Sequence, residues 1–272
     1  MNCFALGERR RMIDLSIIIL HYRTPNLLVE CLESLRRHPF TLGTSEIWVV
    51  DNASGDGTPA RIRREFPEVQ VLENPANLGF AAGNNRGIAR SQGRYILLLN
   101  PDTQVQAGAL DELVRFMEEH PEAGAAGGQL IGLDGEIQTS CRAFPNLLGV
   151  ILRGTPLHRL FPSHPSLCRY LMTDWDHRTP RQVDWVLGAC LLIRREAWEQ
   201  VGPLDEGFFM YYEDIDWCYR AHAAGWSVYY VPTARIIHHH RRESARGPFN
   251  RLTWIHVRSI MRLFSKHPLP LW

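Results

Sequence analysis

Short apolar runs alternate with amphipathic segments through the first half of the chain. The runs are rich in branched residues, as in strands that a sheet buries on both faces, and the segments between them carry apolar residues at helical spacing. This alternation predicts an α/β fold with a Rossmann-like, mostly parallel sheet flanked by helices. The predicted strands are 15–20, 46–50, 69–72 and 95–99, and the predicted helices begin at Pro25 or span 58–66, 78–87 and 107–119.

Polar residues follow each of these four strands. Parallel sheets bind ligands outside the carboxyl ends of their strands, so these clusters would meet along one edge of the sheet. A single cluster would be explained by the turn preference of Asn, Asp, Gly and Pro, but four in succession predict a binding cleft. The clusters are His21 with Tyr22, Asp51 with Asn52, residues 74–77, and residues 100–102.

The chemistry of this edge suits a nucleotide but not a dinucleotide cofactor. The G-x-G-x-x-G pattern that binds a pyrophosphate is absent after the first strand, where residues 21–26 read His-Tyr-Arg-Thr-Pro-Asn. The aromatic ring, the acid and the amide that follow the first two strands could instead stack on a nucleotide base and form hydrogen bonds with it. Asp102 offers a carboxylate for a hard divalent cation that bridges to phosphates, and a nucleoside diphosphate leaving group needs such neutralisation.

The second half has a less regular pattern. A hairpin is expected at 129–139, with its turn at Asp134 and Gly135. The segment 142–180, which we call the excursion, is rich in Pro, Arg, His and Leu and is expected to cross the cleft with short helices; acceptor choice is predicted for 142–182. Further predictions are a strand at 183–193, a strand at 226–231 closed by Pro232, and a basic amphipathic helix from about 250.

The stretch 204–218 joins an apolar, aromatic run to three carboxylates, Glu213, Asp214 and Asp216. Unpaired carboxylates resist burial, so this arrangement favours acids held at the edge of a cleft. The alternative is a helix N-terminus, where acidic side chains accept hydrogen bonds from free backbone N–H groups, with Asp216 paired to Arg220. The stretch alone leaves both interpretations open.

Composition narrows the class of protein. A formal net charge of +1 over 272 residues gives no reason to expect nucleic acid as a partner, and six cysteines without a C-x-x-C pair favour reduced thiols. No apolar stretch has the length of a secretory signal core or a membrane span. We expect a cytoplasmic protein, with peripheral attachment to the inner face of the cell membrane as an open alternative.

Six motifs occur in succession along the chain, at 16–19, 49–58, 77–88, 98–103, 188–193 and 202–218. Together they resemble the inverting glycosyltransferase family 2, which has the GT-A fold, and in particular bacterial rhamnosyltransferase-like members that build cell-surface polysaccharides. The resemblance implies a GT-A domain at 14–245 between an N-terminal extension, 1–13, and a helical tail, 246–272.

The resemblance also implies roles for individual residues. Asp214, beside Glu213, matches the catalytic base. Asp102 matches the second aspartate of a D-x-D motif that binds a metal ion, Mg²⁺ or Mn²⁺, and Asn100 stands at the first position of this motif. His238 matches a histidine near the metal, although His239 or His240 could be its equivalent. The expected nucleotide-binding residues are His21, Tyr22, Asp51, Asn52, Asn77 and Asn84, and those lining the sugar and acceptor pocket are Gly188, Ala189 and Trp185, with a core position for Trp185 as the alternative.

The predicted function is therefore transfer of a sugar, with rhamnose as one candidate, from a nucleoside-diphosphate donor to a hydroxyl of a glycan or lipid-linked glycan. The acceptor hydroxyl would lose its proton to Asp214 as it attacks, and one in-line displacement would invert the anomeric centre. A metal-dependent nucleotide-sugar hydrolase and a silent nucleotide-sugar-binding module are the rivals. The oligomeric state, monomer or homodimer, stays open.

The basic tail helix has two interpretations. Trp254 and its apolar neighbours could contact a membrane surface that carries a lipid-linked acceptor. The helix could instead be docked on the catalytic domain with an exposed basic face. The basic residues concerned are Arg251, Arg258, Arg262 and Lys266.

Overall fold

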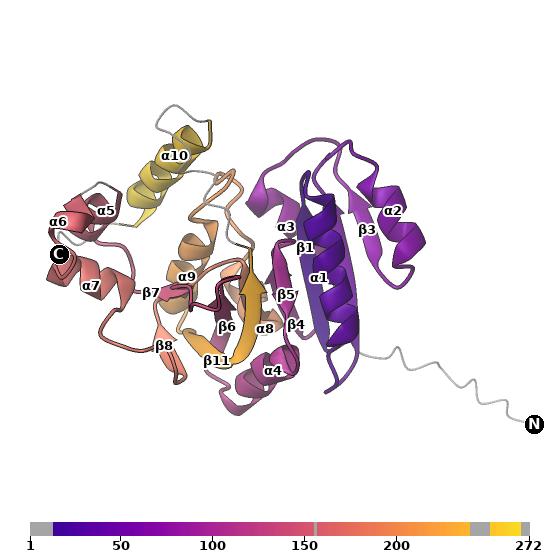
Figure 1. Ribbon diagram of the computed structural model, residues 1–272, viewed down its shortest axis with the longest axis horizontal. Coiled ribbons are helices and arrows are strands. Elements are labelled where there is room, and N and C mark those ends of the chain that lie inside the picture. The colour runs from indigo at the N-terminus through magenta and orange to yellow at the C-terminus, as the bar shows by residue number, and fades with distance from the viewer. Residues whose placement is uncertain (1–12, 155–156, 240–250, 268–272) are drawn as a thin grey trace, which may run out of the picture.

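A mixed nine-stranded sheet forms the centre of the protein in a computed structural model that describes residues 13–154, 157–239 and 251–267 (Figure 1). The strand order is β3-β2-β1-β4-β10-β6-β11-β5, with β8 also paired to β11. The α/β prediction is confirmed. The expected N-terminal extension lies outside the described residues except for Ile13, so nothing tests that boundary.

The first half follows the predicted pattern closely. β1 is parallel to both β2 and β4, and β2 is parallel to β3. The apolar run of β1 is almost fully buried, which explains why it does not alternate with polar residues. The elements of this half are β1 (Leu15–His21), α1 (Pro25–Arg37), β2 (Ser45–Asp51), α2 (Thr58–Glu65), β3 (Gln70–Glu73), α3 (Phe80–Ile88), β4 (Tyr95–Leu99), β5 (Thr103–Val105) and α4 (Ala109–Glu119).

The second half turns the sheet into a mixed one. β10 lies antiparallel between β4 and β6, whereas β11 is parallel to β6 and antiparallel to β5 and β8. Two short strands, β7 and β9, form a separate antiparallel pair. The remaining elements are β6 (Ala123–Ile131), β7 (Cys141–Arg142), α5 (Leu147–Gly154), α6 (Leu157–Leu160), α7 (Pro165–Leu171), β8 (Arg181–Val183), β9 (Trp185–Val186), β10 (Cys190–Arg194), α8 (Arg195–Val201), α9 (Glu213–Ala223), β11 (Ser227–His238) and α10 (Arg251–Lys266).

Three details of this half differ from the sequence predictions. The segment 183–193 is not one strand, because the chain leaves the main sheet after β8, pairs with β7 at β9 and re-enters the main sheet at β10. The strand at 226–231 does not close at Pro232 but runs on to His238, with a register shift that accommodates the proline between Val231 and Arg235. The hairpin turn at Gly135 forms with φ +82°, but its second arm makes only the isolated Ile131–Ile137 bridge.

Two apolar clusters lie on opposite faces of the sheet. Ile17 and Ile19 of β1 belong to the cluster under α1 and α4, whereas Ile18 belongs to the cluster under α3, α8 and α9. This alternation along a single strand is the two-residue period of a pleated sheet. The five cysteines of the described residues are free thiols, in line with the predicted reduced state, and Cys3 lies outside them.

Candidate active site and metal centre

The carboxyl ends of β1 and β2 bring His21 and Asp51 side by side, as the parallel register requires. His21 is fully buried, with Nε2 3.8 Å from Asp51 Oδ1 and 3.6 Å from Asp56 Oδ2. Burial lowers the pKa of His21, while the two carboxylates oppose that shift. Tyr22 is 41% exposed, and the guanidinium of Arg23 lies 5.2 Å from its ring, so an aromatic face remains open at this edge.

The asparagines predicted to bind the nucleotide are bonded to one another and to the backbone. Asn52 Nδ2 donates to Asn77 Oδ1 at 2.9 Å and to the Gly79 carbonyl at 3.1 Å, and Asn52 Oδ1 accepts from Asn74 Nδ2 at 3.0 Å. Asn84 donates to the first carbonyl of its own helix, α3. These side chains therefore shape the loop around the cleft, and their contact with a nucleotide stays a prediction.

Gly79 joins the loop of the asparagine cluster to the segment that precedes Glu213 and Asp214. Its φ of +84° and the 2.2 Å gap between an added Cβ and the Phe209 carbonyl oxygen exclude a larger residue. The same carbonyl accepts a hydrogen bond from the Phe80 N–H at 2.6 Å. This backbone contact holds the start of α3 close to the segment that precedes α9.

Asp102 and His238 meet where β5 pairs with β11. His238 Nε2 lies 3.6 Å from Asp102 Oδ1. Gln138 Nε2 donates to the His238 carbonyl at 3.0 Å, so its Oε1, 2.7 Å from His238 Nδ1, accepts the ring proton. The lone pair of Nε2 is then directed to the side where Asp102 lies.

The electrostatics of His238 suit a metal ligand. Burial and the neighbouring His239 lower the pKa of His238 to about 4, so its ring is neutral at pH 7, as coordination requires. His239 faces the other way and has Nε2 3.2 Å from Gln104 Nε2, while His240 lies outside the described residues. Of the alternatives that the sequence left open, His238 is the one beside Asp102.

This pair is small for a metal centre. Within 13–154, 157–239 and 251–267, no three His, Cys, Asp or Glu side chains are grouped so that they could hold an ion. One carboxylate and one imidazole nevertheless fit a divalent cation that takes its other ligands from water and substrate phosphates. Asn100, at the first position of the motif, donates its backbone N–H to the Ala189 carbonyl at 3.0 Å.

Replacement of Gln138 by leucine tests the metal assignment. Without its acceptor, His238 loses the bond that orients the ring, and partners of this kind typically contribute 10–100-fold to metal affinity. We expect the Mn²⁺ concentration for half-maximal nucleotide-dependent stabilisation to rise about 10–100-fold. Gln92→Leu, at an exposed position, is the matched control. An unchanged Mn²⁺ requirement would remove His238 from the metal site.

Glu213 and Asp214 open α9 after two residues in the left-handed region, Tyr211 and Tyr212, with φ of 73° and 72°. Asp214 Oδ2 accepts the Gly188 N–H at 2.9 Å, and its Oδ1 accepts the Ile215 N–H at 2.8 Å. Two backbone donors hold this carboxylate in place. Strained backbone of this kind concentrates at functional sites.

Glu213 and Asp214 are adjacent acids that are both buried. Burial, then the Asp214 charge, raises the pKa of Glu213 well above its ordinary range, and Glu213 Oε2 has no hydrogen-bond partner among the described residues. Burial also raises the pKa of Asp214, but the backbone donors and the guanidinium of Arg142 oppose that shift. Asp214 is thus the acid that has two backbone donors and a nearby cation, which suits its carboxylate to the role of a general base.

The residues predicted to line the sugar pocket have different positions. Gly188 and Ala189 lie at the entry to β10, where they contact Asp214 and Asn100 through their backbone. Trp185 is buried in the core, and its indole N–H donates to the Ala143 carbonyl at 2.9 Å. The structure thus gives Trp185 the core position that the sequence left as the alternative.

Arg142 is a site residue that the sequence analysis missed. It pairs with Trp185 across the β7–β9 ladder, and its guanidinium lies over the rings of Tyr170 and Trp185 at 5.8 and 5.4 Å. Its Nε is buried and has no hydrogen-bond partner among the described residues. No motif surrounds it in the excursion, so only the three-dimensional pairing reveals its position near Asp214.

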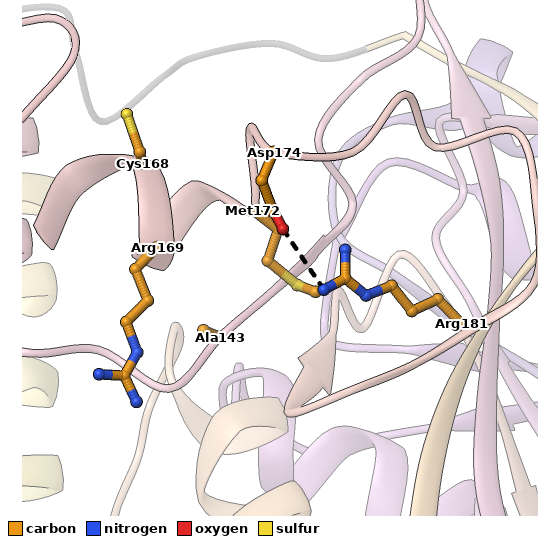
Figure 2. A pocket seen from close by; sticks show the side chains of 6 residues that line it. All are labelled: Ala143, Cys168, Arg169, Met172, Asp174 and Arg181. Carbon is orange, nitrogen blue, oxygen red and sulfur yellow. Dashed lines mark hydrogen bonds and ion pairs between the residues drawn. The ribbon is translucent and has the colours of Figure 1, made fainter. Parts of the chain in front are cut away.

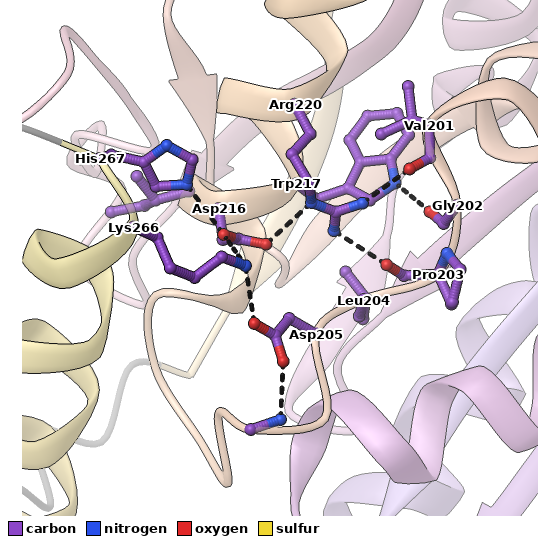
Figure 3. A network of polar contacts seen from close by, with 12 residues as sticks. Val201, Gly202, Pro203, Leu204, Asp205, Asp216, Trp217, Arg220, Lys266 and His267 are labelled. Carbon is purple, nitrogen blue, oxygen red and sulfur yellow. Dashed lines mark hydrogen bonds and ion pairs between the residues drawn. The ribbon is translucent and has the colours of Figure 1, made fainter.

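Helix α10 is docked on the segment that carries the acids (Figure 3). Asp216 is fully buried and contacts Arg220, as predicted, together with Lys266 at 2.6 Å and His267 at 2.9 Å. Asp205 pairs with Arg262 and with Lys266, and despite partial burial these contacts lower its pKa to about 2. Arg262 and Lys266 reach these carboxylates while 40% and 30% of their side chains stay exposed, so α10 is docked on the catalytic domain, as one of the two interpretations expected.

A hollow of about 350 Å³ lies in the excursion, between α7 and β8 (Figure 2). Its lining is mostly apolar, and the Arg181 guanidinium lies 3.5 Å from Asp174 at its side. It lies within the segment predicted to choose the acceptor. Its lining residues are Ala143, Cys168, Arg169, Met172, Asp174 and Arg181.

Known proteins resemble the chain in sequence. A sequence model of glycosyl transferase family 2 matches residues 16–148. N-acetylglucosaminyl-diphospho-decaprenol L-rhamnosyltransferase of Mycobacterium tuberculosis is 34% identical over 232 residues, which cover 81% of this chain and 75% of the relative. Rhamnosyltransferase WbbL of Escherichia coli is 27% identical over 206 residues, which cover 69% of this chain and 70% of WbbL.

Solved structures share the fold at low identity. GalNAc-T7 with UDP, GalNAc and Mn²⁺ gives a TM-score of 0.63 at 16% identity, over 86% of this chain but only 45% of that one. Mannosyltransferase PcManGT from Pyrobaculum calidifontis with GDP-Man and Mn²⁺ gives 0.62 at 18% identity, over 94% of this chain and 65% of that one.

The mixed sheet, flanked by helices and shared with these neighbours, is the GT-A fold. The family model and the mycobacterial relative show that the protein is a glycosyltransferase. The chain belongs to glycosyl transferase family 2 and is rhamnosyltransferase-like within it.

Proposed function

We propose that this protein transfers a sugar, with rhamnose as the first candidate, from a nucleoside diphosphate to a hydroxyl of a lipid-linked glycan, with inversion at the anomeric carbon. The observation that carries the proposal is the carboxylate of Asp214 at the start of α9, which the Gly188 and Ile215 N–H groups hold in place beside the buried Glu213. Rhamnose and the lipid-linked acceptor are supported by the name and similarity of the mycobacterial relative.

Different residues act on the acceptor and on the donor. Asp214 accepts the proton of the acceptor hydroxyl as its oxygen attacks the anomeric carbon, and the bond to the diphosphate breaks on the opposite face. The Gly188 and Ile215 N–H groups orient Asp214 during this step. Tyr22 and Asp51 bind the base and ribose of the donor.

Asp102 and His238 would hold the divalent cation, for which Mn²⁺ in both structural neighbours is a support. When bound, the cation neutralises charge on the leaving diphosphate. Arg142 adds a fixed positive charge on the acceptor side, where it favours the ionised form of Asp214. A hydrolase would need the same groups but no acceptor, so product formation without acceptor separates the two reactions.

Thermal unfolding with a nucleotide panel tests the donor site. We expect dTDP, UDP or GDP to raise the melting temperature only when Mn²⁺ or Mg²⁺ is present, because a ligand that binds only the folded state stabilises it by mass action, by about 2.7 kcal/mol at 100 times its Kd. AMP with the same metals is the control. If none of the diphosphates raised the melting temperature with either metal, the proposed donor site would be contradicted.

A further inference from the structure

Helix α10 exposes an apolar stripe on the side away from the catalytic domain. Trp254 is 65% exposed, Val257 40% and Met261 66%, and their spacing of three and four residues places them on one helical face. Large exposed apolar side chains that form a continuous surface mark a contact site rather than ordinary surface. Its inward face, in contrast, carries the buried Ser259 and Leu263.

Positive charge borders this stripe. Arg251 and Arg258 are exposed, and neither has an ion-pair partner in the part of the chain that the structure describes. The sequence of α10 contains no Asp or Glu. An apolar face that includes Trp, flanked by arginines, is the pattern of a helix that lies in the interface of an anionic bilayer.

The short helices of the excursion lie near α10. Arg153 of α5 is close enough to His256 that its charge adds to the effect of burial in lowering the pKa of that histidine, and α5, α6 and α10 lie at the same end of the molecule (Figure 1). The excursion has exposed apolar side chains of its own, namely Leu147, Ile151, Leu160 and Phe161.

We propose that the outward face of α10 binds the surface of an anionic lipid bilayer. Charge decides between occupants, because a second copy of the chain would present the same arginines and be repelled, whereas acidic lipid headgroups complement them. This deepens the proposed function, since it holds the catalytic domain at the surface where a lipid-linked acceptor is found.

The inward face of α10 connects this surface to the base. His256 Nε2 lies 2.9 Å from the Tyr212 hydroxyl, and Ser259 Oγ donates to the Met210 carbonyl at 2.8 Å. Both partners belong to the segment immediately before Glu213. The bilayer surface and the catalytic segment are thus separated by a single helix, about 10 Å across.

Co-sedimentation of the purified full-length protein with vesicles tests the proposal. We expect binding to phosphatidylglycerol–phosphatidylcholine vesicles, weaker binding at high salt, and little binding to phosphatidylcholine alone. Trp254→Ala with Met261→Ala should lower the partition coefficient about tenfold or more, and Arg258→Glu at least about fivefold. Exposed positions near α1, on the opposite side of the molecule, supply the matched controls Leu42→Ala and Arg37→Glu.

The possible outcomes separate cleanly. Each variant is first shown to keep the nucleotide-dependent rise in melting temperature, which verifies the fold without reference to lipid. Wild-type protein that stays in the supernatant with anionic vesicles, or variants that sediment like the wild type, would overturn the proposal. A dimer that Trp254→Ala dissociates would also overturn it, in favour of self-association. Failure of nucleotide stabilisation with intact vesicle binding would instead count against the proposed function.

Discussion

Replacement of Asp214 by asparagine is expected to lower kcat by about 10²- to 10⁴-fold, the contribution typical of a positioned general base. Asparagine keeps the size of the side chain and one oxygen that can accept from Gly188 or Ile215, but it cannot take a proton from the acceptor hydroxyl. The Kd of the donor nucleotide should change less than twofold. Initial rates with a saturating acceptor, and nucleotide titrations of the same preparation, measure the two effects.

The control for this variant is Asp134→Asn, an exposed turn residue. In the wild type, the raised pKa of Asp214 should move the acid limb of kcat/KM to a higher pH than an ordinary aspartate gives, because the base is inactive once protonated. Activity is then lost as the pH falls through that pKa. Loss of nucleotide binding in Asp214→Asn, with kcat unchanged, would instead assign this carboxylate to the donor site.

Replacement of Asp102 by alanine should remove the metal dependence of nucleotide binding and lower activity by at least about 100-fold, because the carboxylate is the only charged ligand that we assign to the cation. His238→Ala should act in the same direction. His239→Ala is a matched control, since the imidazole of His239 contacts Gln104 instead of lying beside Asp102. Titration of Mn²⁺ against the nucleotide-dependent melting temperature measures all three.

The reverse pattern would contradict the assignment. If His239→Ala abolished the Mn²⁺ response and His238→Ala left it intact, the ligand would be His239. A response that survives Asp102→Ala would show that the cation binds through the nucleotide alone.

The sequence predicted the first half of the fold well because local signals agreed there. The apolar run of β1 and the proline that opens α1 each specify one element, and the parallel register then brings His21 beside Asp51. The segment 183–193 failed because an apolar run does not show where a strand leaves the sheet. Gly188 turns out of the ladder so that its N–H can reach Asp214, and that long-range bond has no local signature.

The environment of the candidate site was harder to predict than its residues. Asp102 and Asp214 belong to motifs that are visible in the sequence. Gln138 and Arg142 do not, because each acts through a contact with a residue far away in the chain. Gln138 contacts His238, and Arg142 contacts Trp185. The contacts of the C-terminal helix were equally hard to predict from sequence. Its basic residues looked alike in sequence, yet Lys266 is drawn inward by the buried Asp216, a pairing that depends on where α9 begins.

The position of β10 between β4 and β6 has a consequence for how the protein is made. The parallel ladder of β3, β2, β1 and β4 joins segments close in the chain and can form early during synthesis, because local contacts form fastest and chains fold from their first residues. β10 follows only after the whole excursion, and α10 reaches Asp216 later still. The nascent chain thus forms the parallel ladder first, and the contact of α10 with Asp216, close to Asp214 in the chain, can form only later.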